Sequence, residues 1–253
     1  MLGHFWMAAP RPGPAIPHEG KPVMRVITMN CALFEHGNPI PDLAVWAPDI
    51  VLLQDVYPAQ VGMLASALYG GHGDSCSHDT NGIITRWKIQ REVPHPTLRD
   101  QQVTICLPDT TAVEVVNVHL VSAATDLRFW RRVTWRDHRI NLALRLDELS
   151  IVQQILGRTT SFPNTPTLFG GDFNSPATDV VDDLVQARGL IDAFAAAGTG
   201  WGDTYHCQLP VLRIDRLYAT RHFTPVRSIA VPIHSDHRMV VTDFAISWGQ
   251  SPQ

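Results

Sequence analysis

The sequence lacks a long hydrophobic segment, an apolar leader and an excess of basic charge. No apolar run approaches the roughly 18 residues of a membrane span, and the first 22 residues carry five prolines in place of a continuous apolar signal-peptide core. Lysine occurs at Lys21 and Lys88 alone, and the formal net charge is -4. We therefore expect a cytoplasmic protein without an integral membrane segment, in which any polyanionic ligand meets a local basic patch.

Cysteine is also scarce, and the four cysteines are widely spaced with no Cys-x-x-Cys pair. This spacing disfavours a zinc ribbon and a dense disulfide framework and agrees with an intracellular protein, although four cysteines can still form two bridges. Potential metal ligands recur in one Gly-rich segment, at His72, Asp74, Cys76, His78 and Asp79. Structural zinc needs four convergent ligands, and this spacing matches no common template. We interpret the segment as a solvated loop, with a zinc site as the alternative.

The sequence does contain ample material for one large core. At 253 residues, with 45% hydrophobic and 17% charged residues, it has the size of a single α/β or β-sandwich domain. We expect one domain over residues 23–248. A disordered or loosely packed Pro-rich tail (1–22) precedes it and a short tail (249–253) follows.

Periodicity predicts alternating strands and helices. Runs rich in Val, Ile and Leu predict strands over 25–29, 50–56, 82–85, 103–107, 113–120, 167–169, 214–218 and 239–246. Helices are predicted over 59–68, about 134–156 with Gly157 as the stop, 180–187 and 191–196. This alternation indicates a two-sheet α/β sandwich or an open α/β sheet.

Polar residues stand where many of these strands end. They are Asn30, Gln54 and Asp55, Asn81, Asn117 and His119, Asp172 and Asn174, Asp215, and Asp236 and His237. Burying so many polar groups without partners would be costly, so one shared site explains them together. Side chains at i and i+2 of an extended segment point the same way, so Asp172 and Asn174 could converge on one ligand. A Gly/Asp/Asn turn without chemistry is the alternative.

The order of these motifs resembles the endonuclease/exonuclease/phosphatase superfamily, which has the DNase I-like fold. The likeness runs from about residue 25 to residue 246. It rests on Met29–Asn30, Leu53–Asp55, Asn81–Ile83, Asn117–Leu120, Gly170–Asn174, Arg213–Asp215 and Ser235–His237. The resemblance implies a four-layer α/β sandwich of two mixed β-sheets packed face to face with outer helices. It also implies that residues 23–248 form a catalytic domain with its site at one rim.

The activity that the resemblance implies is metal-dependent hydrolysis of a phosphoester by in-line attack of an activated water. A divalent cation offsets the charge that develops on the phosphate, and carboxylates and amides suit Mg²⁺ or Mn²⁺. By resemblance, Asn30 and Asp55 form the core of a site for one or two ions. Asp236 lies near it or at a second ion position.

The other motifs supply the remaining roles, again by resemblance. Asp172 orients or deprotonates the attacking water, and Asn174 positions that water or a phosphate oxygen. His119 and His237 donate hydrogen bonds to the phosphate. Asp215 pairs with His237, holds its tautomer and raises its pKa.

Several of these residues also have a purely structural interpretation. Asn30 could cap a turn, His119 could be a buried core histidine, and Asp215 could form an ion pair with Arg213 or Arg216. These alternatives stay open at the level of the sequence.

Asp55 departs from the family pattern, in which the metal ligand at this position is typically Glu. The carboxylate is withdrawn by one methylene, so the metal must shift or a water must fill the gap. This departure motivates a different hypothesis, a catalytically weakened binding module that keeps the fold.

The most basic stretch is residues 128–139, which hold five arginines together with Phe129, Trp130 and Trp135. Arginines fork to phosphate oxygens and aromatic rings stack on bases, which favours single-stranded or distorted DNA or RNA as substrate. The predicted substrate-binding residues are Asn81, Arg128, Trp130, Arg131 and Arg132. The alternative is an amphipathic helix start with tryptophans in the core and arginines in solvent.

Substrate identity therefore divides into hypotheses. The first is a phosphodiesterase acting on nucleic acid or a nucleotide. The alternative is a phosphatase or phospholipase-type enzyme acting on a lipid head group or a small soluble phosphate. An exposed apolar loop beside the site would favour lipid, with Trp130, Trp135 and Trp201 as candidates. No stable protein partner is inferred.

Overall fold

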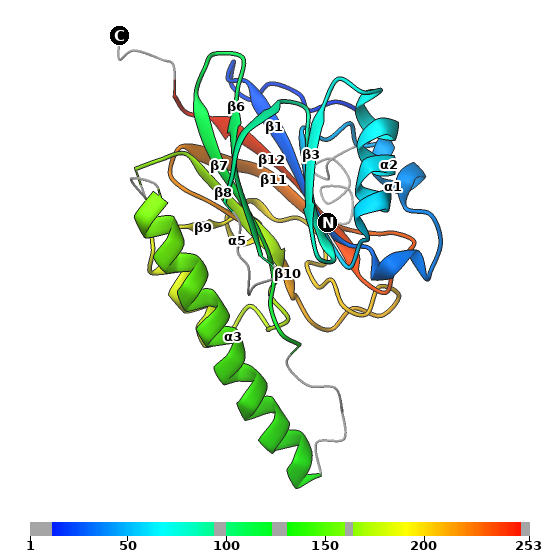
Figure 1. The fold of residues 1–253 in the computed structure, drawn as a ribbon, viewed down its shortest axis with the longest axis vertical. Coiled ribbons are helices and arrows are strands. Elements are labelled where there is room, and N and C mark those ends of the chain that lie inside the picture. Colours follow the sequence, from blue (N-terminus) through cyan, green and yellow to red (C-terminus); the bar gives the residue numbers. More distant parts are fainter. Residues whose placement is uncertain (1–11, 94–99, 123–130, 160–163, 249–253) are drawn as a thin grey trace, which may run out of the picture.

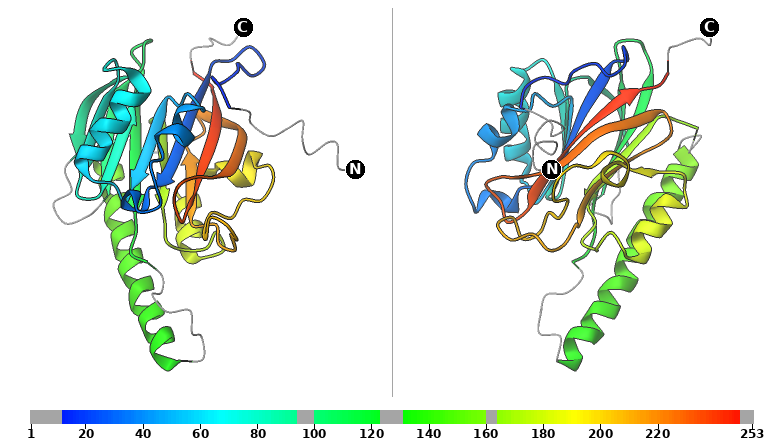
Figure 2. Two further views of the ribbon diagram at one scale, coloured as in Figure 1. Left: turned by 90° about the vertical axis from the view of Figure 1, so that its right-hand side faces the viewer. Right: turned by 180° about the vertical axis from the view of Figure 1, so that it is seen from behind.

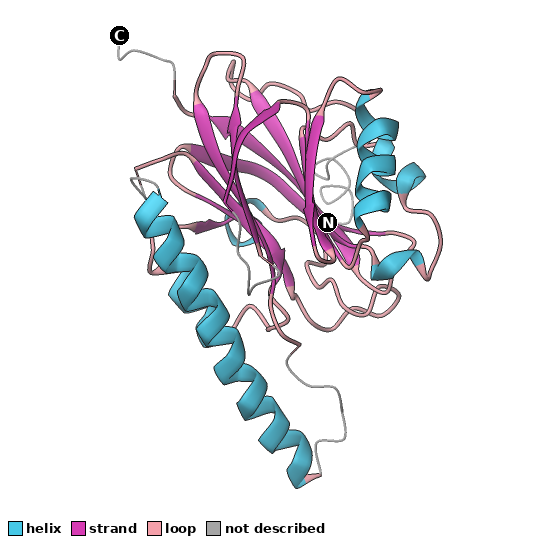
Figure 3. Cartoon of the chain, viewed as in Figure 1, coloured by secondary structure: helices cyan, strands magenta, loops and turns pink. Residues whose placement is uncertain are grey.

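The computed structural model describes residues 12–93, 100–122, 131–159 and 164–248. Over these residues the chain forms two six-stranded sheets. The sheets pack face to face, with helices outside them (Figure 1; helices cyan and strands magenta in Figure 3). The predicted four-layer α/β sandwich is thereby confirmed.

The first sheet has the strand order β11-β12-β1-β2-β4-β3. Its strands are β1 (Val23–Asn30), β2 (Ile50–Gln54), β3 (Asp74–His78), β4 (Asn81–Thr85), β11 (Phe223–Pro232) and β12 (Arg238–Ile246). Strands β1 and β2 run parallel, and the other neighbours are antiparallel. The last residues of β1 and β2 therefore meet the first residues of β4 and β12 at one rim.

The second sheet has the order β5-β6-β7-β8-β10-β9. Its strands are β5 (Lys88–Val93), β6 (Gln101–Cys106), β7 (Ala112–His119), β8 (Thr167–Asp172), β9 (Ile191–Asp192) and β10 (Asp215–Ala219). Strands β7 and β8 are parallel, and β10 is antiparallel to β8. Here too, two strand ends and one strand start gather at a single rim.

Alternation along the strands divides the apolar residues between the layers. Val26 of β1 and Leu168 of β8 belong to the core between the sheets. The next residue in each strand faces outward: Ile27 packs on the helix side of the first sheet and Phe169 on that of the second. This is the period-two pattern expected of strands buried on both faces.

Helices cover the outer faces of both sheets. They are α1 (Ile40–Ala44), α2 (Pro58–Tyr69), α3 (Arg132–Thr159) and α4 (Val180–Gln186). The one-turn 3-10 helix Ala32–Phe34 follows β1, and the short α5 (Ala193–Ala197) instead buries Ala193 in the core between the sheets. Helices α1 and α2 bury Leu43 and Leu64 against the first sheet, whereas α3 and α4 bury Leu149 and Val181 against the second. Helix α2 begins at a proline and ends at Gly70 in the left-handed conformation (φ 58°), as expected for its start and stop signals.

The sequence predicts the interior strands and misses the edges. All eight predicted strands are present, with ends that differ by a few residues. The four strands that the sequence does not predict are β3, β11, β5 and β9, which are the outermost strands of the two sheets. Edge strands need less apolar character and tolerate proline, as at Pro225 beside the irregular register of β11.

The segment with recurring metal ligands is not a loop, which corrects the sequence-based interpretation. Residues Asp74–His78 form β3 and pair with β4. Cys76 packs against the core between the sheets, and Asp74 accepts a hydrogen bond from the Ile89 N–H at 3.1 Å. Within the described part of the chain, the one group of three convergent metal-ligating side chains lies elsewhere, at the rim.

Helix α3 is longer than predicted, because it runs through Gly157 to Thr159. A glycine inside a helix costs only about 1 kcal/mol relative to alanine, so it does not stop a helix that is otherwise well formed. The N-terminal half of α3 projects beyond the sandwich in all three views (Figures 1 and 2). Trp135 in this half is 53% exposed, so the alternative that placed the tryptophans in the core is wrong for this residue.

The part of the N-terminal segment that the structure describes contacts the first sheet. The Gly13 N–H donates to the Val45 carbonyl at 2.6 Å, and the Gly13 carbonyl accepts a hydrogen bond from the Arg25 guanidinium. The boundary between tail and domain at residue 22 stays a prediction. All four cysteines are free thiols. None of the described helices has the length and apolar character that crossing a bilayer requires.

Candidate active site

Side chains from both sheets meet at the rim where β1, β2, β7 and β8 end. Register places His119 of β7 beside Asp172 of β8, and Asp172 beside Asp215 at the start of β10. On the other sheet, Asn30 stands next to Gln54, the residue before Asp55. The predicted convergence of strand-end polar residues is therefore present in the fold.

Asp172 lies at the centre of this group and is fully buried. Its Oδ1 accepts the Asn174 N–H at 2.8 Å, and its Oδ2 accepts a hydrogen bond from Asn30 Nδ2 at 3.1 Å. The Nε2 atoms of His119 and His237 each lie 3.9 Å from the same Oδ2. Burial, together with the negative charge of Asp215, raises the pKa of the Asp172 carboxyl. A carboxylate held in this way is suited to accept a proton.

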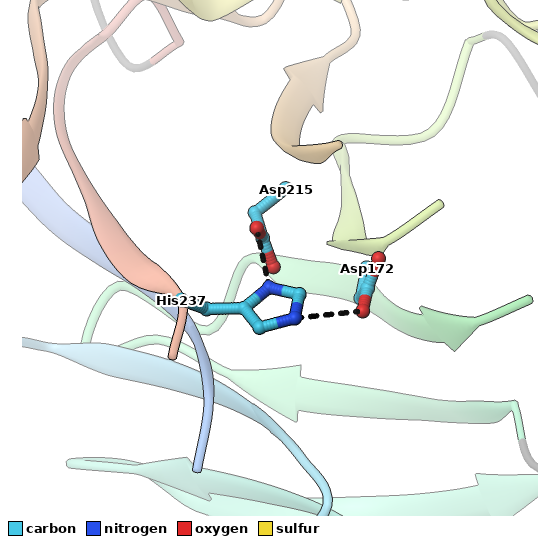
Figure 4. A group of neighbouring side chains, drawn as sticks. All are labelled: Asp172, Asp215 and His237. Carbon is cyan, nitrogen blue, oxygen red and sulfur yellow. Dashed lines mark hydrogen bonds and ion pairs between the residues drawn. The ribbon is translucent and has the colours of Figure 1, made fainter. Parts of the chain in front are cut away.

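His237 lies between two carboxylates (Figure 4). Its Nδ1 is 2.9 Å from Asp215 Oδ2. Its backbone N–H donates to Ser235 Oγ at 3.1 Å, and the Tyr205 ring lies beside the imidazole with 5.0 Å between ring centroids. Burial alone would lower the pKa of His237. The charge and hydrogen bond of Asp215, with the charge of Asp172, outweigh burial and raise the pKa to about 10. The imidazole is therefore cationic at neutral pH.

Asn30 and Asp55 form the more open side of the site. Asn30 Nδ2 donates to Asp55 Oδ2 at 3.2 Å as well as to Asp172, and Asn30 Oδ1 accepts the Ala32 N–H at 3.0 Å. The Asp55 side chain is 33% exposed, and its Oδ1 lies 3.8 Å from His119 Nδ1. Asp55 is thus more open to solvent than the buried carboxylates of Asp172 and Asp215.

Asp236 joins the site through Ser235. The Ser235 hydroxyl contacts Asp236 Oδ1 at 3.4 Å and the Asn30 carbonyl at 2.8 Å. The charge of Asp236 also contributes to the raised pKa of His237. Among the His, Cys, Asp and Glu side chains that the structure describes, Asp172, Asp215 and His237 offer ligand atoms within 4.8 Å of one another. Assignment of the metal to Asn30, Asp55 and Asp236 stays a prediction.

The geometry after β8 differs from the expectation for Asn174. Its φ of 49° is left-handed, so residues 172–174 are a turn closed by the Asp172 carboxylate rather than an extended segment. The Asn174 Nδ2 donates to the Leu120 carbonyl at 2.9 Å, which ties this turn to the end of β7. Its role toward water or phosphate stays a prediction. Asn81, fully buried opposite Gln54, likewise keeps its substrate role as a prediction.

The alternative ion pairs of Asp215 are wrong. Arg213 pairs with Asp192 at 2.8 Å, and Arg216 lies 3.6 Å from Asp182. Asp215 and Arg216 are successive residues of a strand, so their side chains leave on opposite faces. Asp215 contacts His237 instead, as the motif comparison predicts.

Of the predicted nucleic-acid patch, Arg131 and Arg132 are exposed at the beginning of α3. Arg128 and Trp130 lie outside the described residues. Helix α3 starts beyond the end of the sandwich at which β7 ends (Figure 1). The two arginines are therefore at the same end of the molecule as the site.

Some supporting residues have no motif in the sequence. The buried Asp100 accepts the His119 N–H at 3.0 Å, and burial raises the pKa of its carboxyl to about 7. The buried Arg145 of α3 donates to the Asn174 carbonyl at 2.9 Å. Both residues are distant in sequence from the groups that they contact. The only sequence signal for either is that Arg145 falls on the buried face of a long helix, and this signal does not indicate which residue it contacts.

The two stacked mixed sheets and a rim of carboxylate, amide and imidazole groups define the DNase I-like class of α/β sandwich. The sequence model of the Endonuclease/Exonuclease/phosphatase family matches residues 28–237, and the chain belongs to this family. Its members are hydrolases that act on phosphoester bonds.

Solved structures agree with this assignment at the level of the fold. An endonuclease/exonuclease/phosphatase family protein from Bacteroides thetaiotaomicron aligns with TM-score 0.72 and 15% identity over 90% of this chain and 100% of its own. The mannosyl-6-phosphatase Bt3783 of the same species aligns with TM-score 0.69 and 15% identity, over 88% of this chain and 100% of its own. A humanized D. rerio TDP2 aligns with TM-score 0.61 and 18% identity, over 88% of this chain and 98% of its own. No curated protein matches the sequence.

Proposed function

We propose that this protein is a divalent-metal-dependent phosphoesterase that hydrolyses a phosphodiester by in-line attack of an activated water, with nucleic acid or a nucleotide as the first substrate class. The observation that carries the proposal is Asp172, a buried acceptor flanked by His119 and His237 and hydrogen-bonded to Asn30. Asp172 can thus accept a proton from water while His119 and His237 donate hydrogen bonds to a phosphate.

The donor set fits Mg²⁺ or Mn²⁺. The ion pairs that Asp55, Asp172 and Asp215 form with described residues involve histidine alone, with no arginine or lysine. The cationic His237 offsets only part of their negative charge, so these clustered carboxylates favour a bound cation, and oxygen ligands suit a hard one. Asn30 and Asp55 would hold the ion, with Asp236 nearby. The ion would supply Lewis acidity toward the phosphate.

The protein side chains divide the remaining tasks. Asp172 orients the water and takes its proton, while the cationic His237 donates from Nε2 to a phosphate oxygen. Asp215 orients the His237 ring and stabilises its positive charge through its contact with Nδ1. His119 supplies a second donor from the other sheet. Its backbone N–H donates to Asp100, which holds this end of β7 in place.

Nucleic acid is favoured as substrate by the exposed Arg131 and Arg132 at the site end of the molecule. A lipid head group or a small phosphate is the second candidate, and a different observation favours it. The loop that carries Tyr205, whose ring contacts His237, also displays Trp201, Leu209 and Val211, which are 66%, 78% and 66% exposed. An apolar loop beside the site is suited to a lipid surface.

A panel assay with Mg²⁺ or Mn²⁺ tests the function and separates the substrates. The protein is offered single- and double-stranded DNA, RNA, bis-p-nitrophenyl phosphate, p-nitrophenyl phosphate, sphingomyelin and phosphoinositides. We expect cleavage that chelator abolishes and that His237→Ala and Asp172→Asn each reduce by at least ~100-fold. If every substrate stays intact with metal present, the enzymatic proposal fails. The alternative of a binding module, motivated by Asp55, then takes its place.

A further inference from the structure

The candidate site takes its side chains from both sheets, so its geometry depends on how the sheets are held together at the rim. Asn30 and Asp55 come from the first sheet, whereas His119 and Asp172 come from the second. The core between the sheets is built of apolar side chains, and apolar contacts are non-directional. A directional link close to the rim is needed to fix these four residues relative to one another.

Asn117 forms such a link. It lies on β7 two residues before His119, so the two side chains leave the strand on the same face, and it is fully buried. Its Nδ2 donates to the Leu53 carbonyl at 2.9 Å and to the Gly82 carbonyl at 3.0 Å. Leu53 and Gly82 are register partners on β2 and β4. One side chain of the second sheet thus holds two neighbouring strands of the first.

The same amide is tied to the proposed metal ligands through Gln54. Asn117 Oδ1 accepts a hydrogen bond from Gln54 Nε2 at 2.6 Å, and Gln54 directly precedes Asp55. Gln54 Nε2 also donates to Thr28 Oγ1 at 3.2 Å, two residues before Asn30. A buried polar chain therefore runs from β7 through β2 to β1 directly beneath the site.

We propose that Asn117 is a positioning residue that sets the spacing and register of the two sheets at the rim. It thereby fixes the Asn30 and Asp55 pair against the His119 and Asp172 pair. The inference rests on the proposed function, since this placement matters for catalysis only if the four residues act on one phosphate. Catalytic groups tolerate little displacement, and an error of about 1 Å can cost ~100-fold in rate.

Asn117→Leu tests this role, because leucine has a similar volume and forms none of the three hydrogen bonds. The matched control is Val115→Ala, which removes apolar packing from the same strand two residues further from the rim. For Asn117→Leu we expect kcat to fall at least ~10-fold with KM within about 3-fold, and the Mn²⁺ dissociation constant, measured by electron paramagnetic resonance, to rise at least ~10-fold. Val115→Ala should keep kcat, KM and the Mn²⁺ dissociation constant within about 3-fold of the wild type, even if its melting temperature falls as much as that of Asn117→Leu.

Asn117→Ser is the second variant, since serine keeps one donor and leaves a smaller change if the leucine variant does not fold. We expect its Mn²⁺ affinity to lie between those of the wild type and Asn117→Leu. A crystal structure of either variant should show the distance from Asn30 Nδ2 to Asp172 Oδ2 lengthened from 3.1 Å. If that distance and the Mn²⁺ affinity are unchanged, the positioning role is overturned. If the wild type cleaves no phosphoester, the proposed function fails, and the same distance still decides the role of Asn117.

Discussion

His237 Nδ1 and Asp215 Oδ2 lie 2.9 Å apart at the buried rim of the sandwich, and each side chain comes from a different sheet. The contact orients the imidazole ring and keeps both of its nitrogens protonated at neutral pH, because the charge of Asp215 outweighs the effect of burial and raises the pKa of His237 to about 10. The Nε2–H is left to face Asp172 and the substrate space. An imidazolium in this place can donate to a phosphate oxygen throughout the neutral range.

Asp215→Asn should remove this charge while keeping the size of the side chain. Without the carboxylate the pKa of His237 falls and the tautomer is no longer fixed, so we expect kcat at pH 7.5 to drop at least ~100-fold. KM should change much less, since the proposed metal site is left intact. Steady-state kinetics on the cleaved substrate measures both values.

The control for this variant is Asp243→Asn, which breaks a buried ion pair with Arg25 at the other end of β12. It should lower the free energy of unfolding, because it leaves Arg25 buried without its charge partner, yet retain kcat within about 3-fold when assayed well below its melting temperature. Equal losses of kcat in both variants would show that Asp215 acts through stability alone.

The fold was predictable where one physical signal dominated. Interior strands such as β2, buried along its whole length, must be apolar because both faces meet other layers. The polar edge strand β3 carries no such signal, and its pairing with β4 depends on a neighbour that the local sequence does not reveal. Helix α3 was predictable in position, but its end was not, since Gly157 stops a helix only if the chain turns there.

The candidate site was predictable from the order of its motifs rather than from local pattern. His119 and Asp172 are 53 positions apart in sequence and become neighbours only through the parallel pairing of β7 and β8. The supporting contacts of Asp100, Arg145 and Asn117 depend on side-chain directions in the packed structure. No spacing rule in a single sequence supplies those directions.

Asp55→Glu should restore the ligand length that is typical of the family at this position. Because Asp55 is a partly exposed carboxylate beside Asn30, an added methylene can be accommodated on the open side of the proposed metal site without entering the core. We expect the Mn²⁺ dissociation constant to fall by ~3-fold to 10-fold, measured by isothermal titration calorimetry. Asp55→Asn, with one charge fewer, should weaken binding by at least ~10-fold. Unchanged affinity in both variants would remove Asp55 from the metal site.

Replacing Arg131 and Arg132 together with alanine tests the nucleic-acid hypothesis. Each arginine that contacts a phosphate contributes about 0.7 to 0.9 to the slope of log K against log salt. Loss of both should flatten that slope by up to ~2 and weaken binding of single-stranded DNA at low salt. Fluorescence anisotropy, recorded over a salt range of about 50 to 200 mM, measures the slope and the affinity.

Arg188→Ala with Arg221→Ala is the matched control for the arginine patch, since both residues are exposed and Arg221 follows β10 at the end of the strand away from Asp215. This double variant removes the same amount of charge. It should leave the salt slope unchanged if Arg131 and Arg132 themselves contact the nucleic acid. An equal flattening in the two double variants would mean that net charge, and not Arg131 and Arg132, governs binding.

Asp100→Asn should reveal a pH-dependent cost of burying this carboxyl behind His119. Burial, reinforced by the charge of Glu148, raises the pKa of Asp100 to about 7 in the folded state, against about 3.9 in an unfolded chain. The folded protein therefore holds this proton more tightly than the unfolded chain. The contribution of Asp100 to the free energy of unfolding therefore decreases as pH rises from about 4 to about 7 and is constant outside that range. Asparagine cannot ionise but still accepts the His119 N–H.

The stabilisation of Asp100→Asn relative to the wild type should thus grow by roughly 2 to 3 kcal/mol between pH 5 and pH 8, since each pKa unit corresponds to about 1.4 kcal/mol. Urea unfolding at the two pH values, with chelator present throughout, measures the difference. Asp109→Asn is the control, because this exposed carboxylate has a pKa lowered by the Thr111 N–H and is ionised in both states across that range. A relative stability of Asp100→Asn that stays constant with pH would show that Asp100 is ionised in the folded protein, and that His119 is held by a charged rather than a neutral acceptor.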